Sequence, residues 1–266
     1  MIIKAIGSIA SCLYNGVERQ MEPIRLARMG CSLISSGCSI KGNIPGDYLG
    51  SYLAGNQRND GGWADVEETL WCIGYLRSFG SRYCDSVNLG YKWLISARVG
   101  CGAWGKSNRD QARIPITALA AVLAPDVIDY QATNWLSKQW KYDLEGPTPL
   151  TYKGAFFLLA QSHPHYQKVN RLLVRTINYL KTEQQDDGGF APWKGHPVGS
   201  DPWTTGIVLW GLSSSGKHAP KTTIRRAIQW LESTQLSNGL WPYHYLDDGT
   251  AMALIGLSSA LAVLRN

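Results

Sequence analysis

Apolar and polar positions along the chain form two patterns, and each pattern predicts a different kind of α-helix. The first is amphipathic: over Thr222–Thr234 the apolar residues recur every three or four positions and mark one face of a helix. The second is apolar or small on all sides, as expected of a buried helix. Segments of this second kind are Thr69–Leu76, Ile116–Leu123, Gly154–Leu159, Thr205–Leu212 and Thr250–Leu264.

A short motif precedes the buried segments and repeats along the chain. An aliphatic residue is followed four positions later by Gln or Arg, and six positions beyond that by an aromatic residue. Most copies carry Gly shortly before the aromatic residue, which suits a chain reversal because Gly accepts positive φ. The copies are Leu53–Gln57–Trp63, Leu94–Arg98–Trp104, Leu180–Gln184–Phe190 and Leu231–Gln235–Trp241.

The gap between the second and third copies is about twice the first gap, which predicts a degenerate copy near residues 131–150. Trp135-Leu136 and Gln139-Trp140 keep part of the motif there. A further helix pair is expected around Ser8–Val17 and Glu22–Ser35.

Repeated helix pairs bury their apolar faces by stacking on their neighbours. We therefore predict an all-α protein, an α/α toroid of five to six helical hairpins with buried helices inside and amphipathic helices outside. No linker divides the chain, so residues 1–266 are expected to be a single domain. The repeats are clearest over 45–266, and residues 1–45 add an N-terminal helical pair.

Composition narrows the range of partners. The chain has 11 Trp but only 17% charged residues, below the usual share of about 25%, so much aromatic surface should face a core or a cavity. The net charge of +6 is scattered and lacks the aromatic interleaving of nucleic-acid binders, so no nucleic-acid partner is expected. Six cysteines without CxxC spacing indicate reduced thiols of a cytoplasmic protein and no metal site. No stretch approaches the ~20 apolar residues that cross a bilayer, which leaves at most peripheral membrane contact.

The Gln–aromatic motif, clearest in Ala227–Trp241, resembles the QW repeat of the terpenoid cyclase and protein prenyltransferase superfamily, in particular its squalene–hopene cyclase-like members. The resemblance implies an α/α toroid in which Gln57, Gln184 and Gln235 cap helix ends and stack on their aromatic residues. Arg98 takes the Gln place in the second copy, where it can still donate to helix-end carbonyls and stack on Trp104.

Class II cyclases of this superfamily protonate an alkene or epoxide with the middle Asp of an Asp-x-Asp-Asp-Thr segment. Asp65–Thr69 has the same register, with Glu67 in place of the acid, and Asp247–Met252 is similar, with Asp248 in place of the acid. Asp201–Thr205 keeps only the first Asp and the Thr. The resemblance therefore implies as catalytic candidates Glu67, Asp248, Asp65, Glu68, Asp201 and Asp247.

The cation formed by such a protonation needs a dry pocket lined by aromatic faces. Candidate substrate-binding residues on or near the buried helices are Trp71, Tyr75, Tyr152, Phe156, Trp203, Trp210, Tyr243 and His244. Arg109 and Arg113 could hold a diphosphate if the substrate carries one, and only in that case would Mg²⁺ be a cofactor. Otherwise no cofactor is expected.

Departures from the superfamily keep a second hypothesis open. Its cyclases place this toroid beside a second helical domain, so a domain on another chain, a partner protein or a smaller substrate would complete the pocket. No DDxxD motif for class I chemistry is present, and no Cys follows Asp201 as in zinc prenyltransferases. We favour a class II cyclase-like enzyme acting on an isoprenoid. The alternative is a non-catalytic toroid that binds a lipid, a peptide or a partner protein.

Each candidate acid also has a simpler interpretation. Asp and Thr at the start of a buried helix are good N-caps, whether or not the helix takes part in catalysis. The aromatic residues could equally fill a core. The observation that separates these interpretations is whether Asp65, Glu67, Asp201 and Asp248 face one cavity or cap their own helices.

Overall fold

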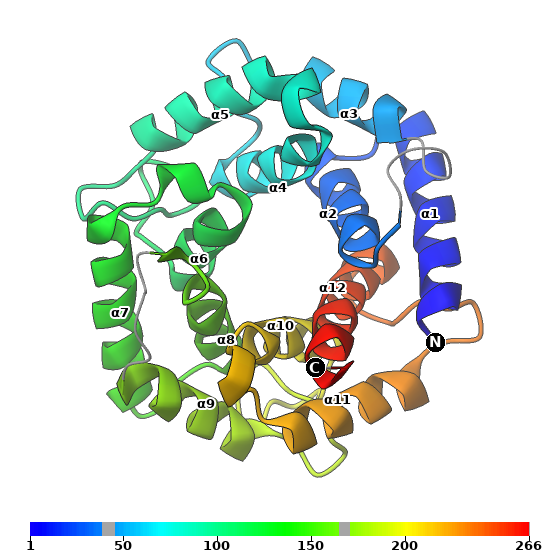
Figure 1. Ribbon diagram of the computed structural model, residues 1–266, viewed down its shortest axis with the longest axis vertical. Coiled ribbons are helices and arrows are strands. Elements are labelled where there is room, and N and C mark those ends of the chain that lie inside the picture. Colours follow the sequence, from blue (N-terminus) through cyan, green and yellow to red (C-terminus); the bar gives the residue numbers. More distant parts are fainter. Residues whose placement is uncertain (39–45, 165–170, 266) are drawn as a thin grey trace.

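The computed structural model describes residues 1–38, 46–164 and 171–265, and these residues form two concentric rings of α-helices (Figure 1). Outer and inner helices alternate along the chain, so each hairpin gives one helix to each ring. The outer helices are α1 (Ile2–Glu18), α3 (Gly46–Gly55), α5 (Cys84–Ser96), α7 (Tyr130–Glu145), α9 (Arg171–Glu183) and α11 (Lys221–Thr234). The inner helices are α2 (Pro23–Ser35), α4 (Val66–Leu76), α6 (Ile114–Leu123), α8 (Thr151–Ala160), α10 (Pro202–Ser213) and α12 (Leu246–Arg265).

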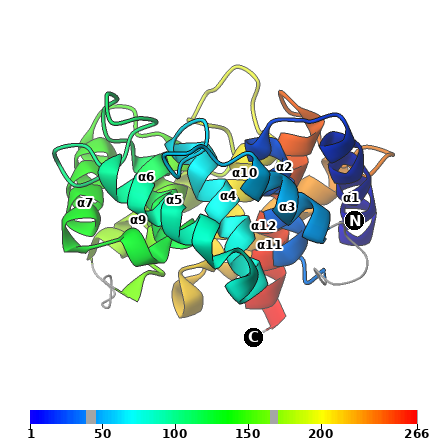
Figure 2. The ribbon, with the colours of Figure 1, turned by 90° about the horizontal axis from the view of Figure 1, so that it is seen from above.

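The predicted all-α toroid is confirmed, and the ring is closed. Each inner helix packs on the next, and α12 packs on both α10 and α2, so the last hairpin meets the first. All inner helices begin on one face of the ring, which we call the mouth. Figure 2 shows the loop between α9 and α10 rising on this face, with the C-terminal end of α12 on the opposite side.

Small residues set how closely the inner helices approach. A Cβ atom added to Gly256 of α12 would lie 2.2 Å from the carbonyl oxygen of Gly206 of α10. A Cβ on Gly211 of α10 would likewise lie 2.5 Å from the carbonyl oxygen of Ala155 of α8. The backbones of α8, α10 and α12 therefore touch, and these glycines are required by close packing.

The Gln of the repeated motif fastens one hairpin to the next. Gln57 Nε2 donates to the carbonyl of Gly61 (2.7 Å) and to that of Ser86 in the next outer helix (2.8 Å). The four-residue step to a glycine carbonyl recurs for the other glutamines, and these glycines have φ between 86° and 94°. Gln184 donates to Gly188 and Thr223, and Gln235 donates to Gly239 (2.8 Å) and to the carbonyl of Met1 (3.3 Å).

The Leu and Trp positions of the motif are also joined through the backbone. The indole N–H of Trp63 donates to the carbonyl of Leu53 at 2.9 Å, and the same bond joins Trp104 to Leu94 and Trp241 to Leu231. Arg98 acts as predicted: its guanidinium lies 4.6 Å from the Trp104 ring centroid and donates to the carbonyl of Val127.

The predicted degenerate copy lies in α7, where the link is different. Trp140 is buried four residues after Leu136, at the place that Gln holds in the other copies, and its indole N–H donates to Thr176 Oγ1 of α9 at 2.7 Å. The acceptor is a side-chain hydroxyl of the next outer helix, where Gln57 and Gln184 use a backbone carbonyl of that helix.

The expected starts of the inner helices were two to four residues too late. The structure begins α4 at Val66, α10 at Pro202 and α12 at Leu246. Their first turns carry charged residues or Pro, so the apolar pattern becomes visible only after the helix has begun.

The expectation that no segment is long and apolar enough to span a bilayer was wrong for α12. This helix has 20 residues and is long and apolar enough to span a bilayer, but 61% of its most apolar stretch is buried inside the ring. Its hydrophobicity fits its place between α10 and α2.

We expect Gln235→Ala to lower the free energy of unfolding by about 1–3 kcal/mol, because two backbone carbonyls lose their donor. The change is measured by chemical denaturation. Gln111→Ala, at an exposed position, is the matched control and should have little effect. Equal stability of Gln235→Ala and the control would show that the amide does not help to close the ring.

Candidate active site

A threonine hydroxyl gives several inner helices the same register at the mouth. The backbone N–H of Trp63 donates to Thr69 Oγ1, and that of Trp241 donates to Thr250 Oγ1, both at 2.9 Å. The same bond joins Phe190 to Thr205 and Trp104 to Thr117. The position two residues before each threonine is therefore equivalent from helix to helix. Glu67 of α4 and Asp248 of α12 both occupy it.

Arg28 of α2 joins these two carboxylates, although they lie on different helices. Its Nη2 is 3.1 Å from Glu67 Oε1, and its Nη1 donates to Asp248 Oδ1. The side chains of Glu67 and Asp248 remain 21% and 17% exposed, so solvent at the mouth reaches both. Lys106 Nζ lies 3.6 Å from Glu67 Oε2. Within the described residues, Glu67 thus has two cationic partners and Asp248 has one.

The other four candidate acids accept hydrogen bonds at the starts of the inner helices or form an ion pair with a neighbouring helix. Asp65 caps α4 by accepting from Glu68 N (2.9 Å), and Glu68 accepts from Ala64 N (2.9 Å). Asp201 caps α10 and accepts from both the N–H and the hydroxyl of Thr204 at 2.7 Å. Asp247 forms an ion pair with Arg25 at 2.6 Å. Arg28 brings Glu67 and Asp248 together at the mouth, and Lys106 Nζ lies 3.9 Å from Asp65 Oδ2 as well as 3.6 Å from Glu67 Oε2.

Three of the candidate aromatic residues form a cluster beside this acidic pair. Trp203 of α10 lies 6.3 Å from Tyr152 of α8 and 6.1 Å from Tyr243, measured between ring centroids. All three keep part of their surface accessible. The pKa of Tyr243 is raised to about 12 by burial first, and then by the nearby charges of Asp201 and Asp248. Tyr243 therefore lies close to both Asp201 and Asp248. The ring of His244 contacts that of Tyr243 at a tilt of 57°, with 4.6 Å between the ring centroids.

Other candidate aromatic residues are packed into the core. Trp71, Tyr75 and Phe156 are at most 3% exposed, so protein atoms cover their faces. Tyr75 fills the space beside Gly30 of α2, where an added Cβ would lie 2.4 Å from its ring. Trp210 is partly exposed and contacts Trp71, with 6.5 Å between the ring centroids.

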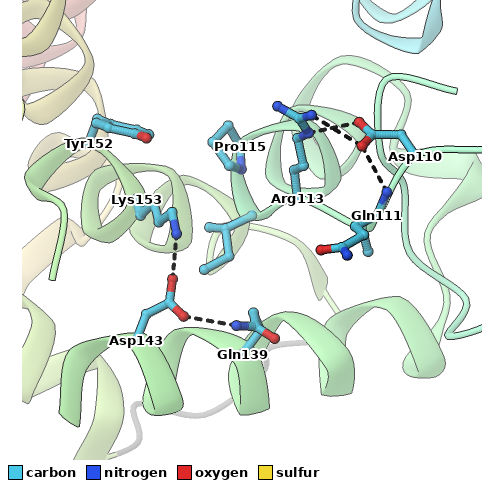
Figure 3. Close-up of a pocket in the computed structure, with 10 residues that line it drawn as sticks. Asp110, Gln111, Arg113, Pro115, Gln139, Asp143, Tyr152 and Lys153 are labelled. Atoms are coloured by element: carbon cyan, nitrogen blue, oxygen red, sulfur yellow. Dashed lines mark hydrogen bonds and ion pairs between the residues drawn. The ribbon is translucent and has the colours of Figure 1, made fainter. Parts of the chain in front are cut away.

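The two candidate arginines do not form an unbalanced positive site. Arg113 pairs with Asp110 at 2.8 Å, and this hydrogen bond is the main cause of the low pKa of Asp110, about 2. Arg113 and Asp110 line a cavity of about 420 Å³, where Lys153 pairs with Asp143 at 2.7 Å (Figure 3). Each cation of this cavity has its own carboxylate, which is unfavourable for a diphosphate. Arg109 is exposed on the neighbouring loop.

Asp201 borders a second and larger cavity, of about 730 Å³, next to the mouth. The cavity lies between the loop before α10, helix α11 and the segment before α12, and its lining is mostly apolar. Burial raises the pKa of Asp201, although the bonds from Thr204 act in the opposite direction. Asp201 is thus an N-cap whose charge is disfavoured by its surroundings. The lining residues include His196, Val198, Trp230, Pro242, Tyr243 and His244.

The sequence did not single out Arg28 or Lys106 as members of the site. Arg28 follows Arg25 by three positions in the expected helix Glu22–Ser35, which was not among the segments predicted to be buried. Among the described residues, no group of three or more His, Cys, Asp or Glu side chains is arranged to hold a metal ion.

The closed ring and its mouth define a terpenoid cyclase-like α/α toroid, and the comparisons agree. Residues 77–255 match the squalene-hopene cyclase C-terminal domain family, and the chain belongs to this family. Asp248 lies inside the matched segment, whereas Glu67 lies before it.

Solved structures share the fold at low sequence identity. The type II terpene cyclase MstE from Scytonema, in complex with its substrate geranylgeranyl dihydroxybenzoate, is 14% identical, with a TM-score of 0.73 and 98% of each chain covered. The ent-copalyl diphosphate synthase from Streptomyces platensis is 15% identical, with a TM-score of 0.65, and the match covers 92% of this chain and 50% of that one.

The same fold also occurs in a different class of protein. A possible member of the GH105 family from Klebsiella pneumoniae is 13% identical, with a TM-score of 0.64, and the match covers 89% of this chain and 82% of that one. The fold alone therefore does not determine the chemistry, which must be argued from the mouth.

We expect Arg28→Met to cost about 2–4 kcal/mol of stability, because two partly buried carboxylates then face each other without their shared cation. Adding Asp248→Asn should restore part of the loss, since it removes one of the two charges. Arg82→Met, which breaks the exposed pair with Asp47, serves as the control in the same denaturation experiments. A loss that Asp248→Asn does not relieve would contradict the shared-cation arrangement.

Asp201→Asn should change the pH dependence of stability. Burial raises the pKa of Asp201 in the folded protein above the ordinary 3.8, so its stabilising contribution is complete below that value and is lost as pH rises through the folded pKa. Asn keeps the cap but does not titrate. The unfolding free energy of the wild type, relative to Asp201→Asn, should therefore fall as pH increases from 3.8 upward; a flat or rising difference would contradict the assignment.

Proposed function

We propose that this protein is a class II cyclase that protonates a linear polyprenyl substrate, with Asp248 as the proton donor. The observation that carries the proposal is the meeting of Asp248 and Glu67 at Arg28, beside the aromatic cluster of Tyr152, Trp203 and Tyr243. Two sequence segments with the register of a cyclase acid motif thus lie at one mouth. Membership of the squalene-hopene cyclase family supports the same function.

The choice of Asp248 over Glu67 rests on the distribution of cations. Glu67 forms ion pairs with both Arg28 and Lys106. Among the described residues, Asp248 pairs only with Arg28. Asp65, Glu67 and Asp248 are three carboxylates that share two cations, Arg28 and Lys106, so one negative charge is left uncompensated. A proton relieves this repulsion best on the carboxyl that has fewer cationic partners. Asp248 is therefore the proposed acid, and Glu67 is its neighbour on Arg28.

The proposed reaction is an isomerisation and needs no oxidant or cofactor. Asp248 transfers its proton to one carbon of the terminal double bond, and the adjacent carbon becomes cationic. The π electrons of the next double bond attack that carbon and close a ring. The final cation loses a proton to water, and Asp248 regains one from solvent at the mouth.

Two groups would stabilise the charges that develop in this reaction. Arg28 stabilises the carboxylate that remains on Asp248 after the transfer. The faces of Tyr152, Trp203 and Tyr243 stabilise the carbocation, by about 0.5–2 kcal/mol each.

A non-catalytic toroid that binds a lipid, a peptide or a partner protein is the second candidate, and one observation favours it. Trp71 and Trp210 meet below the mouth, so the protein fills this part of its own ring. Such a toroid would bind a ligand at the mouth without transforming it.

The test is to incubate the protein with C15, C20 and C30 polyprenyl substrates and to identify the products by gas chromatography and mass spectrometry. We expect a cyclised isomer from the wild type and a loss of about 10²–10⁴-fold in rate for Asp248→Asn, the range of general acid catalysis. Glu67→Gln should lose less. Asp85→Asn, exposed on α5, is the matched control and should keep the wild-type rate.

Two results would decide against the proposal. One is a substrate that binds to the folded protein without any product forming, which would support the non-catalytic toroid. The other is cyclisation that proceeds undiminished in Asp248→Asn.

A further inference from the structure

Two cavities of opposite polarity lie at the mouth, and the aromatic cluster of Tyr152, Trp203 and Tyr243 connects them. Tyr152 lines the cavity of about 420 Å³, which we call the polar cavity, and Tyr243 lines the cavity of about 730 Å³, which we call the apolar cavity. Trp203 lies between these two rings, at 6.3 Å from Tyr152 and 6.1 Å from Tyr243 between centroids. A ligand that lies across the cluster therefore reaches both cavities.

The polar cavity has no net charge but keeps unused hydrogen-bonding groups. Arg113 donates to Asp110 through Nε and Nη2, and Lys153 donates to Asp143 through Nζ (Figure 3). Within the described residues, Arg113 Nη1 and two of the three ammonium protons of Lys153 have no protein acceptor. Gln139 Nε2 donates to Asp143, so the amide oxygen of Gln139 remains available as an acceptor.

This combination of groups selects a neutral head that carries several hydroxyl groups. A hydroxyl both donates and accepts, so it matches the unused N–H groups and the acceptor oxygens together. A diphosphate would bring negative charge beside Asp110 and Asp143, whose cations are already paired. The partly exposed ring of Tyr152 adds a face on which a cyclic head can stack.

The apolar cavity suits the chain of such a ligand. Val198, Trp230 and Pro242 are among the residues that line it. Tyr243, at its border, lies close to Asp248. A prenyl chain that crosses the aromatic cluster into this cavity thus passes the proposed proton donor.

We propose that the ligand of this protein is an amphiphile, with a neutral, hydroxylated ring as its head in the polar cavity and a prenyl chain that crosses the aromatic cluster into the apolar cavity. This inference rests on the proposed function, which supplies the prenyl chemistry of the chain. The head anchors one end of the molecule at α8, and the other end lies at Asp248. A sugar and a polyhydroxylated phenyl ring share the required chemistry of the head.

Three variants test the two cavities separately. Arg113→Met and Lys153→Met each remove donors from the polar cavity. Arg82→Met is the matched control, because Arg82 also pairs with one aspartate and its side chain is 51% exposed, against 54% for Arg113. Val198→Asp, on the exposed loop before α10, places a charge in the apolar cavity without disturbing the core.

The experiment measures the Kd of four compounds with the same C15 chain, by equilibrium dialysis below their critical micelle concentrations and mass spectrometry. They are farnesyl glucoside, farnesyl hydroquinone, farnesol and farnesyl diphosphate. The wild type and Arg82→Met should bind at least one of the two hydroxylated compounds about tenfold more tightly than farnesol and the diphosphate, a difference of about 1.4 kcal/mol. Preference for the glucoside assigns a sugar head, and preference for the hydroquinone assigns a phenolic one.

The variants should divide this preference between the cavities. Arg113→Met and Lys153→Met should weaken the preferred compound about tenfold and leave the Kd of farnesol unchanged. Val198→Asp should weaken all four compounds by a similar factor and keep the order of their affinities.

The outcomes separate this inference from the proposed function. A head preference that depends on Arg113 and Lys153, in a protein that forms no cyclised product, supports the amphiphile and counts against the enzyme. Cyclisation without any head preference overturns the amphiphile and leaves the enzyme. Tightest binding of the diphosphate, an unchanged preference in both polar-cavity variants, or unchanged affinities in Val198→Asp also overturns the amphiphile.

Discussion

Three glutamines fasten the ring, and each donates both N–H groups of one amide to backbone carbonyls. One carbonyl belongs to the glycine that turns the chain, and the other belongs to the start of the next outer helix. The amide therefore fixes the turn within one hairpin and the position of the neighbouring hairpin together. Because each hairpin also carries an inner helix, the spacing of the hairpins sets the spacing of the inner helices and of the side chains in their first turns.

The arrangement of the mouth follows from that shared spacing. Because equivalent threonines hold the starts of α4 and α12, Glu67 and Asp248 stand at the same height and can both reach Arg28. The other acidic residues near these helix starts serve the backbone as caps or pair with Arg25. Acidic residues at the starts of the inner helices thus serve either the scaffold or the proposed chemistry. The position of the residue in the first turn determines whether it caps the helix or pairs with Arg28.

The sequence was sufficient for the fold because its strongest signal is local and periodic. The Leu–Gln–aromatic spacing and the apolar segments predict helical hairpins without any knowledge of distant contacts. The sequence also placed Glu67 and Asp248 at equivalent positions, two residues before Thr69 and Thr250. Arg28 was not predicted, because its hairpin lacks the repeated motif and its partner Asp248 lies 220 positions away. The contact between Trp71 and Trp210 could not be predicted either, since it exists only when two opposite helices of a closed ring face each other.

The bond from Gln235 to the carbonyl of Met1 joins residues 234 positions apart. This bond and the packing of α12 on α2 form the seam where the last hairpin meets the first, and its contacts join residues far apart in the sequence. All other contacts between adjacent inner helices join hairpins that follow one another along the chain. Contacts at this seam form late in folding, because closing so long a loop costs entropy before the contacts compensate for it. During synthesis the hairpins can form one after another as an open arc. The apolar side of α2 that contacts α12 stays exposed to solvent until α12 has folded against it. The seam is therefore the part of the molecule where folding is slowest and where association with a second chain competes most directly with closure.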